Sequence, residues 1–250
     1  MWEWLFALVF VGVAIVLGYL PSRLMRRKYA AIQPADTRAL ASDVMARIGV
    51  LHGLILSLMF ASAHGEAQRF EDGVQAEAAA ATHVYFNAVR YKAPGLEAAI
   101  QAYVVAAIEK DWPQLLDQRA LSNEGWVAWR QVLAASLELR PGDRGQQVLA
   151  DRIQADIWLI QDLRQIRGLQ AINQLSVLFW LISVVGLVLI ATLLFVHEIN
   201  PLHQRLMAMY SLFTGLTLYM IFDLSYPFQG LLTISPSSFQ DALSTIRSGY

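Results

Sequence analysis

The stretch that decides the fold is LSVLFWLISVVGLVLIATLLFV, residues 175–196. It contains no charged side chain and is long enough to cross the hydrocarbon core of a bilayer, which takes about 20 helical residues. An uninterrupted apolar run of this length is typical of a membrane span rather than of a strand or helix in a soluble core. It therefore predicts a transmembrane helix.

Three further apolar runs of similar kind lie elsewhere in the chain, at residues 2–20, 48–65 and 206–222. The first is followed by basic residues, whereas a signal peptide has its positive charge before the apolar stretch, so we interpret it as an uncleaved helix. Hydrophobic residues make up 56% of the chain and charged residues 16%, against roughly 45–50% and 25% in soluble domains. The predicted fold class is an all-α membrane protein with four transmembrane helices and a helical extramembrane insert between helices 2 and 3.

The charges of the connecting segments predict the orientation. Loop 21–47 carries six Lys or Arg residues, and short basic loops remain on the cytoplasmic side of a membrane. With four spans, the insert and both termini then lie on the opposite side. We expect a multi-pass protein of a bacterial inner (cell) membrane, with the insert and both termini periplasmic.

Four parts of the chain follow from these spans. Residues 1–65 hold transmembrane helices 1 and 2 with the basic cytoplasmic loop 21–47, residues 66–174 form the insert, residues 175–222 hold helices 3 and 4, and residues 223–250 form an extended tail. Within the insert, Trp112-Pro113 is expected to end a helix, because Pro disfavours helical geometry in the preceding residue. The first and last helices of the insert are expected to continue from helices 2 and 3 without a break.

Two segments resemble a known family when they are taken together. The first segment is Gly49-Val-Leu-His-Gly-Leu-Ile-Leu-Ser-Leu-Met-Phe-Ala, and it continues through Arg69-Phe70 to Glu77-Ala78. The second segment is Phe222-Asp-Leu-Ser-Tyr-Pro-Phe-Gln-Gly, which is followed by Ile234-Ser-Pro. They resemble a bacterial membrane family described as bestrophin-like, whose members share two spans, an insert with a central Trp-Pro, two more spans and a D-x-x-x-P-F-x-G…S-P tail. The resemblance implies an ion channel by analogy. It also implies structural roles for Arg69, Glu77, Trp112, Pro113, Asp223, Pro227, Phe228, Gly230, Ser235 and Pro236.

One side of the second span is a ridge of small residues. The ridge consists of Gly49, Gly53, Ser57, Ala61 and Gly65, which recur every four residues. Small side chains let helix backbones approach closely in lipid, where packing drives helix association. The ridge predicts either packing against another span of the same subunit or a subunit interface.

A different face of the second span carries a candidate pore lining. It consists of His52, Leu56, Met59, Ala63, Glu66 and Phe70, at alternating spacings of four and three residues. In an oligomeric pore, Leu56 and Met59 would form an apolar constriction, and Glu66 would form a ring of charge that favours cations, although bestrophin channels conduct anions. The alternative is that His52 is a hydrogen-bonded polar group inside the helix bundle of one subunit.

Other classes of function lack support in the sequence. The chain has no cysteine and a net charge of −1, and it contains no nucleophile elbow, P-loop, GxGxxG or HExxH motif. We therefore expect no enzyme, no cofactor, no metal and no nucleic-acid partner. The predicted function is a homo-oligomeric ion channel in a lipid bilayer with helix 2 lining the pore. The alternative is a non-conducting envelope interaction or signalling protein whose periplasmic insert binds a partner.

Overall fold

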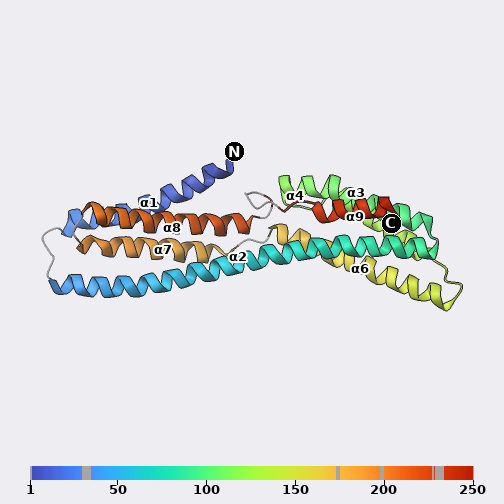
Figure 1. Cartoon of the computed structure of the whole chain (residues 1–250), viewed down its shortest axis with the longest axis horizontal. Helices are drawn as coiled ribbons and strands as arrows, with labels where there is room; N and C mark the ends of the chain where they lie inside the picture. Colours follow the sequence, from blue (N-terminus) through green and yellow to red (C-terminus); the bar gives the residue numbers. More distant parts are fainter. Residues whose placement is uncertain are drawn as a thin grey trace. The chain divides into compact units, whose positions relative to one another are not determined.

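The computed structural model describes residues 2–29, 35–172, 175–197, 200–226, 228 and 234–249, and every regular element in these ranges is a helix. The chain divides into two compact units. Unit 1 comprises Met1–Glu66 and Gln174–Tyr226, and unit 2 comprises Ala67–Asn173 and Pro227–Tyr250. Figure 1 labels the helices of both.

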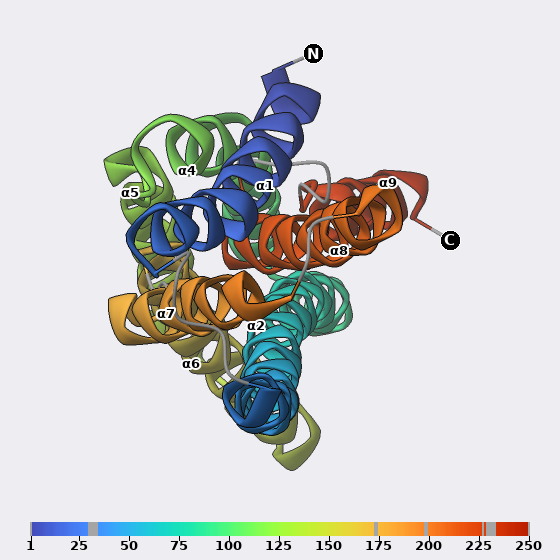
Figure 2. The same cartoon turned by 90° about the vertical axis from the view of Figure 1, so that its left-hand side faces the viewer.

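Unit 1 is a helical bundle. It contains α1 (Trp2–Tyr29), the first part of α2 (Ala35–Tyr91), α7 (Val177–Leu193) with the short 3₁₀ helix η2 (Leu194–Val196), and α8 (Pro201–Ser225); Figure 2 shows them packed side by side. Within the described ranges, four helices are long and apolar enough to cross a membrane. Only 17% of the apolar window of α1 is buried inside the chain, as expected for a surface that faces lipid. The predicted fold class is confirmed.

Close approach of backbones holds α1 against α8. A Cβ added at Gly215 of α8 would lie 2.8 Å from the Cα atom of Val11 in α1. Beside this crossing, Phe10 of α1 packs its ring against Trp180 of α7 and Phe222 of α8, at centroid distances of 6.3 and 5.2 Å. Aromatic contacts and small residues therefore position the spans.

The basic segment of unit 1 is more helical than the sequence predicted. α1 passes through Pro21 and ends at Tyr29, and α2 begins at Ala35, so the described residues of segment 21–47 are helical. Pro removes one backbone donor but does not always end a helix. The Arg- and Lys-rich residues after Pro21 favour helix and continue it.

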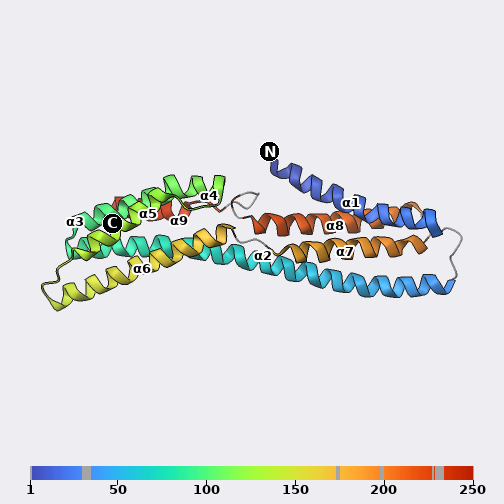
Figure 3. The ribbon, with the colours of Figure 1, turned by 180° about the vertical axis from the view of Figure 1, so that it is seen from behind.

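Unit 2 is built around the second part of α2. The other helices are α3 (Pro94–Ala106), the π-helical turn η1 (Ala107–Asp111), α4 (Trp112–Gln118), α5 (Asn123–Leu137), α6 (Arg144–Ile172) and α9 (Ser237–Ser248), and Figure 3 shows them from behind. The buried core joins all of them through residues such as Val84, Ile100, Leu115, Val132 and Ile157.

Trp112-Pro113 does not end the helix that precedes it. The chain continues from α3 through the π-turn η1 directly into α4, in which Pro113 lies in the first turn. Pro113 lacks a backbone donor, and the π-turn, in which the Trp112 N–H donates to the Ala107 carbonyl, accommodates the change in the hydrogen-bond ladder. The expected break was therefore wrong, and a π-turn takes its place.

The first and last helices of the insert were expected to continue from helices 2 and 3 without a break, but only the first of them does. α2 is one helix of 57 residues that belongs to both units, as predicted. By contrast, α6 ends at Ile172 and α7 begins at Val177, where the Ser176 side chain accepts a hydrogen bond from the Leu178 N–H. A capping serine favours the start of a new helix, so the prediction of an unbroken α6 and α7 was wrong.

The C-terminal segment also differs from its prediction. An extended tail was expected, but residues Ser237–Ser248 form α9, whose Phe239, Ala242 and Ile246 are buried. Their spacings of three and four residues place them on one helical face, which packs into the core of unit 2. Pro227 and Gly230 of the tail motif lie outside the described residues.

Candidate functional site

The face of α2 that was predicted to line a pore lies inside unit 1. His52, Leu56, Met59 and Ala63 are each at most 6% exposed, and the last three pack in a cluster with Leu218 of α8. The space next to this face is filled by helices of the same chain. The predicted pore lining was therefore wrong for these four residues.

His52 has hydrogen-bond partners on two neighbouring spans. Its Nδ1 lies 2.9 Å from the hydroxyl of Tyr210 in α8, and its Nε2 lies 3.0 Å from the carbonyl oxygen of Ser183 in α7. Gly186 leaves room for the ring, because a Cβ there would lie 2.6 Å from His52 Cδ2. His52 is thus a satisfied polar group that connects three helices, which was the alternative interpretation.

The other two residues of this face have different surroundings. Glu66 is half-buried at the boundary of unit 1. Phe70 belongs to the core of unit 2, where its ring lies edge-on to that of Phe228 at 5.2 Å between centroids. The six residues therefore do not form a single lining.

The small-residue ridge of α2 faces outward. Gly53, Ser57 and Ala61 are exposed, and Gly65 is partly exposed. Gly49 instead lines an apolar cavity of about 300 Å³ together with Leu187 of α7. A Cβ added at Gly49 or Gly53 would meet no described atom within 4 Å. Of the two interpretations of the ridge, packing against a span of the same chain does not fit the exposed residues Gly53, Ser57 and Ala61.

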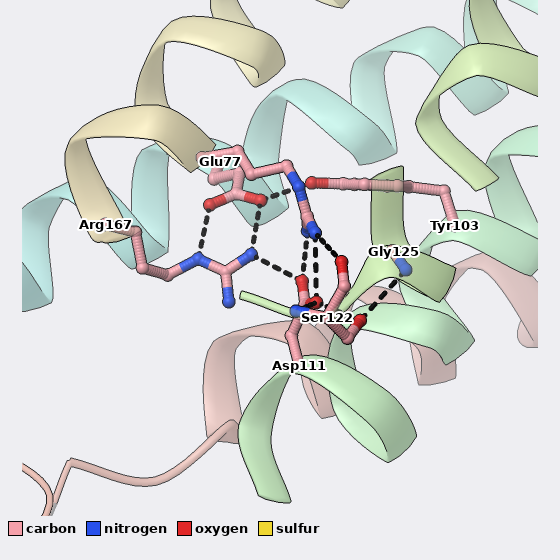
Figure 4. Close-up of polar contacts among 7 residues, drawn as sticks. Glu77, Tyr103, Asp111, Ser122, Gly125 and Arg167 are labelled. Carbon is pink, nitrogen blue, oxygen red and sulfur yellow. Dashed lines mark hydrogen bonds and ion pairs between the residues drawn. The ribbon is translucent and has the colours of Figure 1, made fainter. Parts of the chain in front are cut away.

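A network of buried charges lies in the core of unit 2 (Figure 4). Glu77 of α2, Asp111 of η1, and Arg164 and Arg167 of α6 are each at most 1% exposed. Arg167 donates from Nε and Nη2 to the two carboxylate oxygens of Glu77, at 2.9 and 3.0 Å, and from Nη2 to Asp111 Oδ2 at 3.1 Å. Bidentate pairs of this kind fix both distance and orientation.

Asp111 also joins the network to the start of α5. It accepts hydrogen bonds from Arg164, whose Nη2 lies 3.0 Å from Oδ1, and from the backbone N–H of Ser122, also at 3.0 Å. The Ser122 hydroxyl in turn caps α5 by accepting from the Gly125 N–H at 2.9 Å. A side chain at position 125 would collide with Arg164, because an added Cβ would lie 2.4 Å from its Nη2.

The charges of the network balance, with two guanidinium groups and two carboxylates. Burial disfavours the charged form of Asp111, but hydrogen bonds from Arg164 and the charge of Arg167 hold its pKa below the usual value. Burial, followed by the charge of Glu77, raises the pKa of Tyr103 well above the usual value. Tyr103 therefore stays protonated and donates its hydroxyl hydrogen to Glu77.

Aromatic rings cover the two arginines. The guanidinium of Arg167 lies 5.5 Å from the ring centres of both Trp112 and Phe239, and that of Arg164 lies 4.8 Å from the ring centre of Trp126. Trp112 donates from Nε1 to the Ile234 carbonyl at 3.2 Å. The network is thus enclosed and ties α2, η1, α5 and α6 together, an arrangement suited to fixing a structure rather than to catalysis.

Sequence reasoning missed this network, although a signal for it exists. The buried stripe of α6 runs through Ile153, Ile157 and Ile160 and continues through Arg164 and Arg167 at the same spacings of four and three. Charged residues are almost never buried unless they are paired. Two arginines in register with an apolar stripe therefore indicate buried partners.

The residues named by the resemblance occupy several places. Glu77 belongs to the network, Trp112 and Phe228 are buried beside it, and Pro113 follows Trp112 in α4. Asp223 is buried in α8 of unit 1, and Arg69 is exposed on α2. Ser235 and Pro236 directly precede α9. Most of the motif residues in unit 2 thus surround the network and α9.

One comparison with known proteins gives a match. The family model of the Bestrophin-like domain matches residues 8–239. The chain belongs to the bestrophin-like family. The family match extends over both units and includes the network and most of the four membrane-length helices. No curated protein and no solved structure matches the chain.

These findings together describe a membrane protein of the bestrophin-like family. In such a protein, the exposed apolar side chains of unit 1, for example Leu8 at 69% and Phe213 at 68%, lie on helices long enough to cross a bilayer.

No group of three His, Cys, Asp or Glu side chains suited to a metal ion occurs in the part of the chain that the structure describes.

Proposed function

We propose that this protein is a subunit of a homo-oligomeric ion channel in a bacterial inner membrane, with the ion path between subunits. Membership of the bestrophin-like family supports the channel. The close packing around Met59 supports a path between copies, because this residue on the inner face of α2 is 0% exposed. In this arrangement α2 contributes its outward face instead of the His52 face.

The observation that carries the proposal is the exposed ridge on a membrane-length helix. Gly53, Ser57 and Ala61 lie on the outside of unit 1, and the space next to Gly53 is open. Small residues at such positions let a second helix approach closely and allow backbone contacts in lipid. A second copy of α2 is the partner that a homo-oligomer would supply.

The absence of cysteine makes the contact directly testable. A single Ser57→Cys substitution should give disulfide-linked dimers when membranes are oxidised, because cysteines form disulfides only when their Cα atoms lie within about 7 Å. Phe213→Cys, on the exposed side of α8, is the matched control and should give little crosslinking. Equal crosslinking of both variants would contradict a specific α2 contact.

Conduction needs a separate measurement. The purified oligomer should carry current in planar lipid bilayers, and Ser57→Trp should reduce that current by preventing the close approach of neighbouring α2 helices. His64→Leu, at an exposed position on the same helix, controls for a general effect of substitution in α2. A well-folded, crosslinkable oligomer without any current would overturn the channel and leave the oligomer.

One observation favours a second function, a non-conducting envelope interaction or signalling protein. The buried network gives unit 2 a fixed arrangement of α2, η1 and α6, as a binding module requires. A partner that co-purifies with the protein in a fixed ratio and binds unit 2, together with absence of current, would favour this function.

A further inference from the structure

A polar cleft in unit 2 is separate from the buried network. It lies between α2 and α6, has a volume of about 500 Å³, and is lined by His83, Phe86, Asn87, Arg90, Arg152 and Asp156 among others. Pockets for small molecules usually have volumes of about 300–1,000 Å³. The cleft is therefore large enough for a small organic ligand.

The lining of the cleft holds more cationic side chains than carboxylates. Among the described residues, neither Arg90 nor Arg152 has a carboxylate within ion-pair distance, and Arg90 donates only a long hydrogen bond of 3.3 Å to Asn87 Oδ1. Asp156 is the one carboxylate in the lining, and it interacts electrostatically with His83 and Arg152. Two guanidinium groups thus share the cleft with a single carboxylate.

The buried network shows how the same unit treats arginines that have a structural role. Arg164 and Arg167 are each held by carboxylates at hydrogen-bond distance. Arg90 and Arg152 are exposed at the cleft and have no such partner in the described chain. Guanidinium groups bind carboxylates and phosphates through paired hydrogen bonds, so an anion from outside the chain would complete the cleft.

We propose that the cleft between α2 and α6 binds a small organic anion. Arg90 and Arg152 hold its carboxylate or phosphate group, and Asp156 accepts a hydrogen bond from a hydroxyl or amino group of the same ligand. The Asn87 side chain, which is 8% exposed, supplies a fixed amide at the floor of the cleft. The proposal goes beyond ion conduction and does not depend on it.

The location of the cleft gives such binding a consequence. His83, Asn87 and Arg90 lie on α2, whereas Arg152 and Asp156 lie on α6. A ligand held by both helices would connect α2 to α6 at the cleft, whose lining includes none of the residues that form the ion pairs of the network. Because α2 also belongs to unit 1, the ligand acts on a helix that the membrane bundle shares.

Binding can be measured by isothermal titration calorimetry on the full-length protein in detergent. The probes are inorganic phosphate, L-malate and L-glutamate, which separate a phosphate site from a carboxylate site. At least one probe should bind, and Arg90→Gln and Arg152→Gln should each weaken its binding by about ten-fold or more, as for loss of a charged hydrogen bond. Arg130→Gln removes an exposed charge from α5 and should leave binding unchanged.

Two further variants make the result specific to the cleft. Asp156→Asn should weaken malate or glutamate binding but should not weaken phosphate binding, which has no need of a carboxylate acceptor. Ala155→Trp, at an exposed position in the lining, should abolish binding by filling the cleft without a change of charge. Absence of binding for all three probes at about 10 mM, or equal affinity of Arg90→Gln, Ala155→Trp and Arg130→Gln, would overturn the proposal.

Discussion

Unit 1 and unit 2 differ in where their large apolar side chains lie, although both bury polar groups. In unit 1, large apolar residues point outward, with Val50 at 73% exposed, while His52 is buried between three helices. In unit 2, apolar residues such as Ile157 fill the core, but four charged groups lie among them. The same chain therefore uses two different ways to specify how its helices pack.

The solvent explains the difference. Between helices in lipid the hydrophobic effect gives little preference for one packing over another, so close approach at small residues and single hydrogen bonds become decisive. In water, burial of apolar surface stabilises unit 2, at about 25 cal/mol per Å². Its ion network contributes less to stability than to the choice of one arrangement, because desolvation offsets much of the attraction.

Breaking the network should produce the largest effect. Asp111→Asn leaves Arg164 and Arg167 buried with only one carboxylate between them, and loss of one partner in a buried ion pair costs about 3–5 kcal/mol. Denaturation followed by tryptophan fluorescence should report this loss, because Trp112 and Trp126 contact the two arginines. Asp162→Asn on the exposed side of α6 should change the free energy of unfolding by no more than about 0.5 kcal/mol.

The pH dependence of the same pair of proteins tests the ionic origin of the effect. Because the folded-state pKa of Asp111 is lowered, its contribution is complete above the unfolded value of about 3.9 and is lost as the pH falls through the folded value. The difference in stability between wild type and Asp111→Asn should therefore be greatest at neutral pH and shrink below about pH 4. A difference that stays constant well below about pH 4 would indicate a packing defect instead.

The sequence predicted the elements of unit 1 better than their packing. Continuous apolar runs such as residues 175–196 are enough to identify spans, because bilayer thickness sets their length. The same runs do not show which face is inside, since both faces are apolar. For that reason the sequence predicts that the His52 face of α2 lines a pore, whereas this face is buried inside the helix bundle of a single chain.

In unit 2 the limits of sequence reasoning were different. The amphipathic stripes of α3 and α6 identified helices, but Glu77, Asp111 and Arg164 each look like ordinary surface residues along the chain. Their pairing spans 90 residues between Glu77 and Arg167 and 53 between Asp111 and Arg164. Only the tertiary fold brings such distant residues together, and without it the network could be inferred only from the register of the arginines on α6.

Enlarging a small residue tests packing in unit 1 and should have an intermediate effect. Gly215→Ala places a Cβ 2.8 Å from the Val11 Cα atom, and overpacking of this kind costs about 1–3 kcal/mol. Thermal unfolding in detergent should show the loss. Gly12→Ala is the matched control on α1, because its Cβ would meet no described atom within 4 Å. Equal stability of the two variants would mean that α1 and α8 do not cross closely.

Removing a hydrogen bond from unit 1 should have the smallest effect. His52→Leu deletes the contacts with Tyr210 and the Ser183 carbonyl, and hydrogen bonds between membrane helices are worth about 0.6–2 kcal/mol. Thermal unfolding in detergent should show this modest loss, whereas His64→Leu at an exposed position of α2 should show none. If the oligomer conducts, currents through both variants should equal those of wild type, because a buried helix contact does not meet the ions. If His52→Leu changed the ion selectivity of the current without changing stability, the His52 face would lie in the ion path. That result would contradict its role in packing.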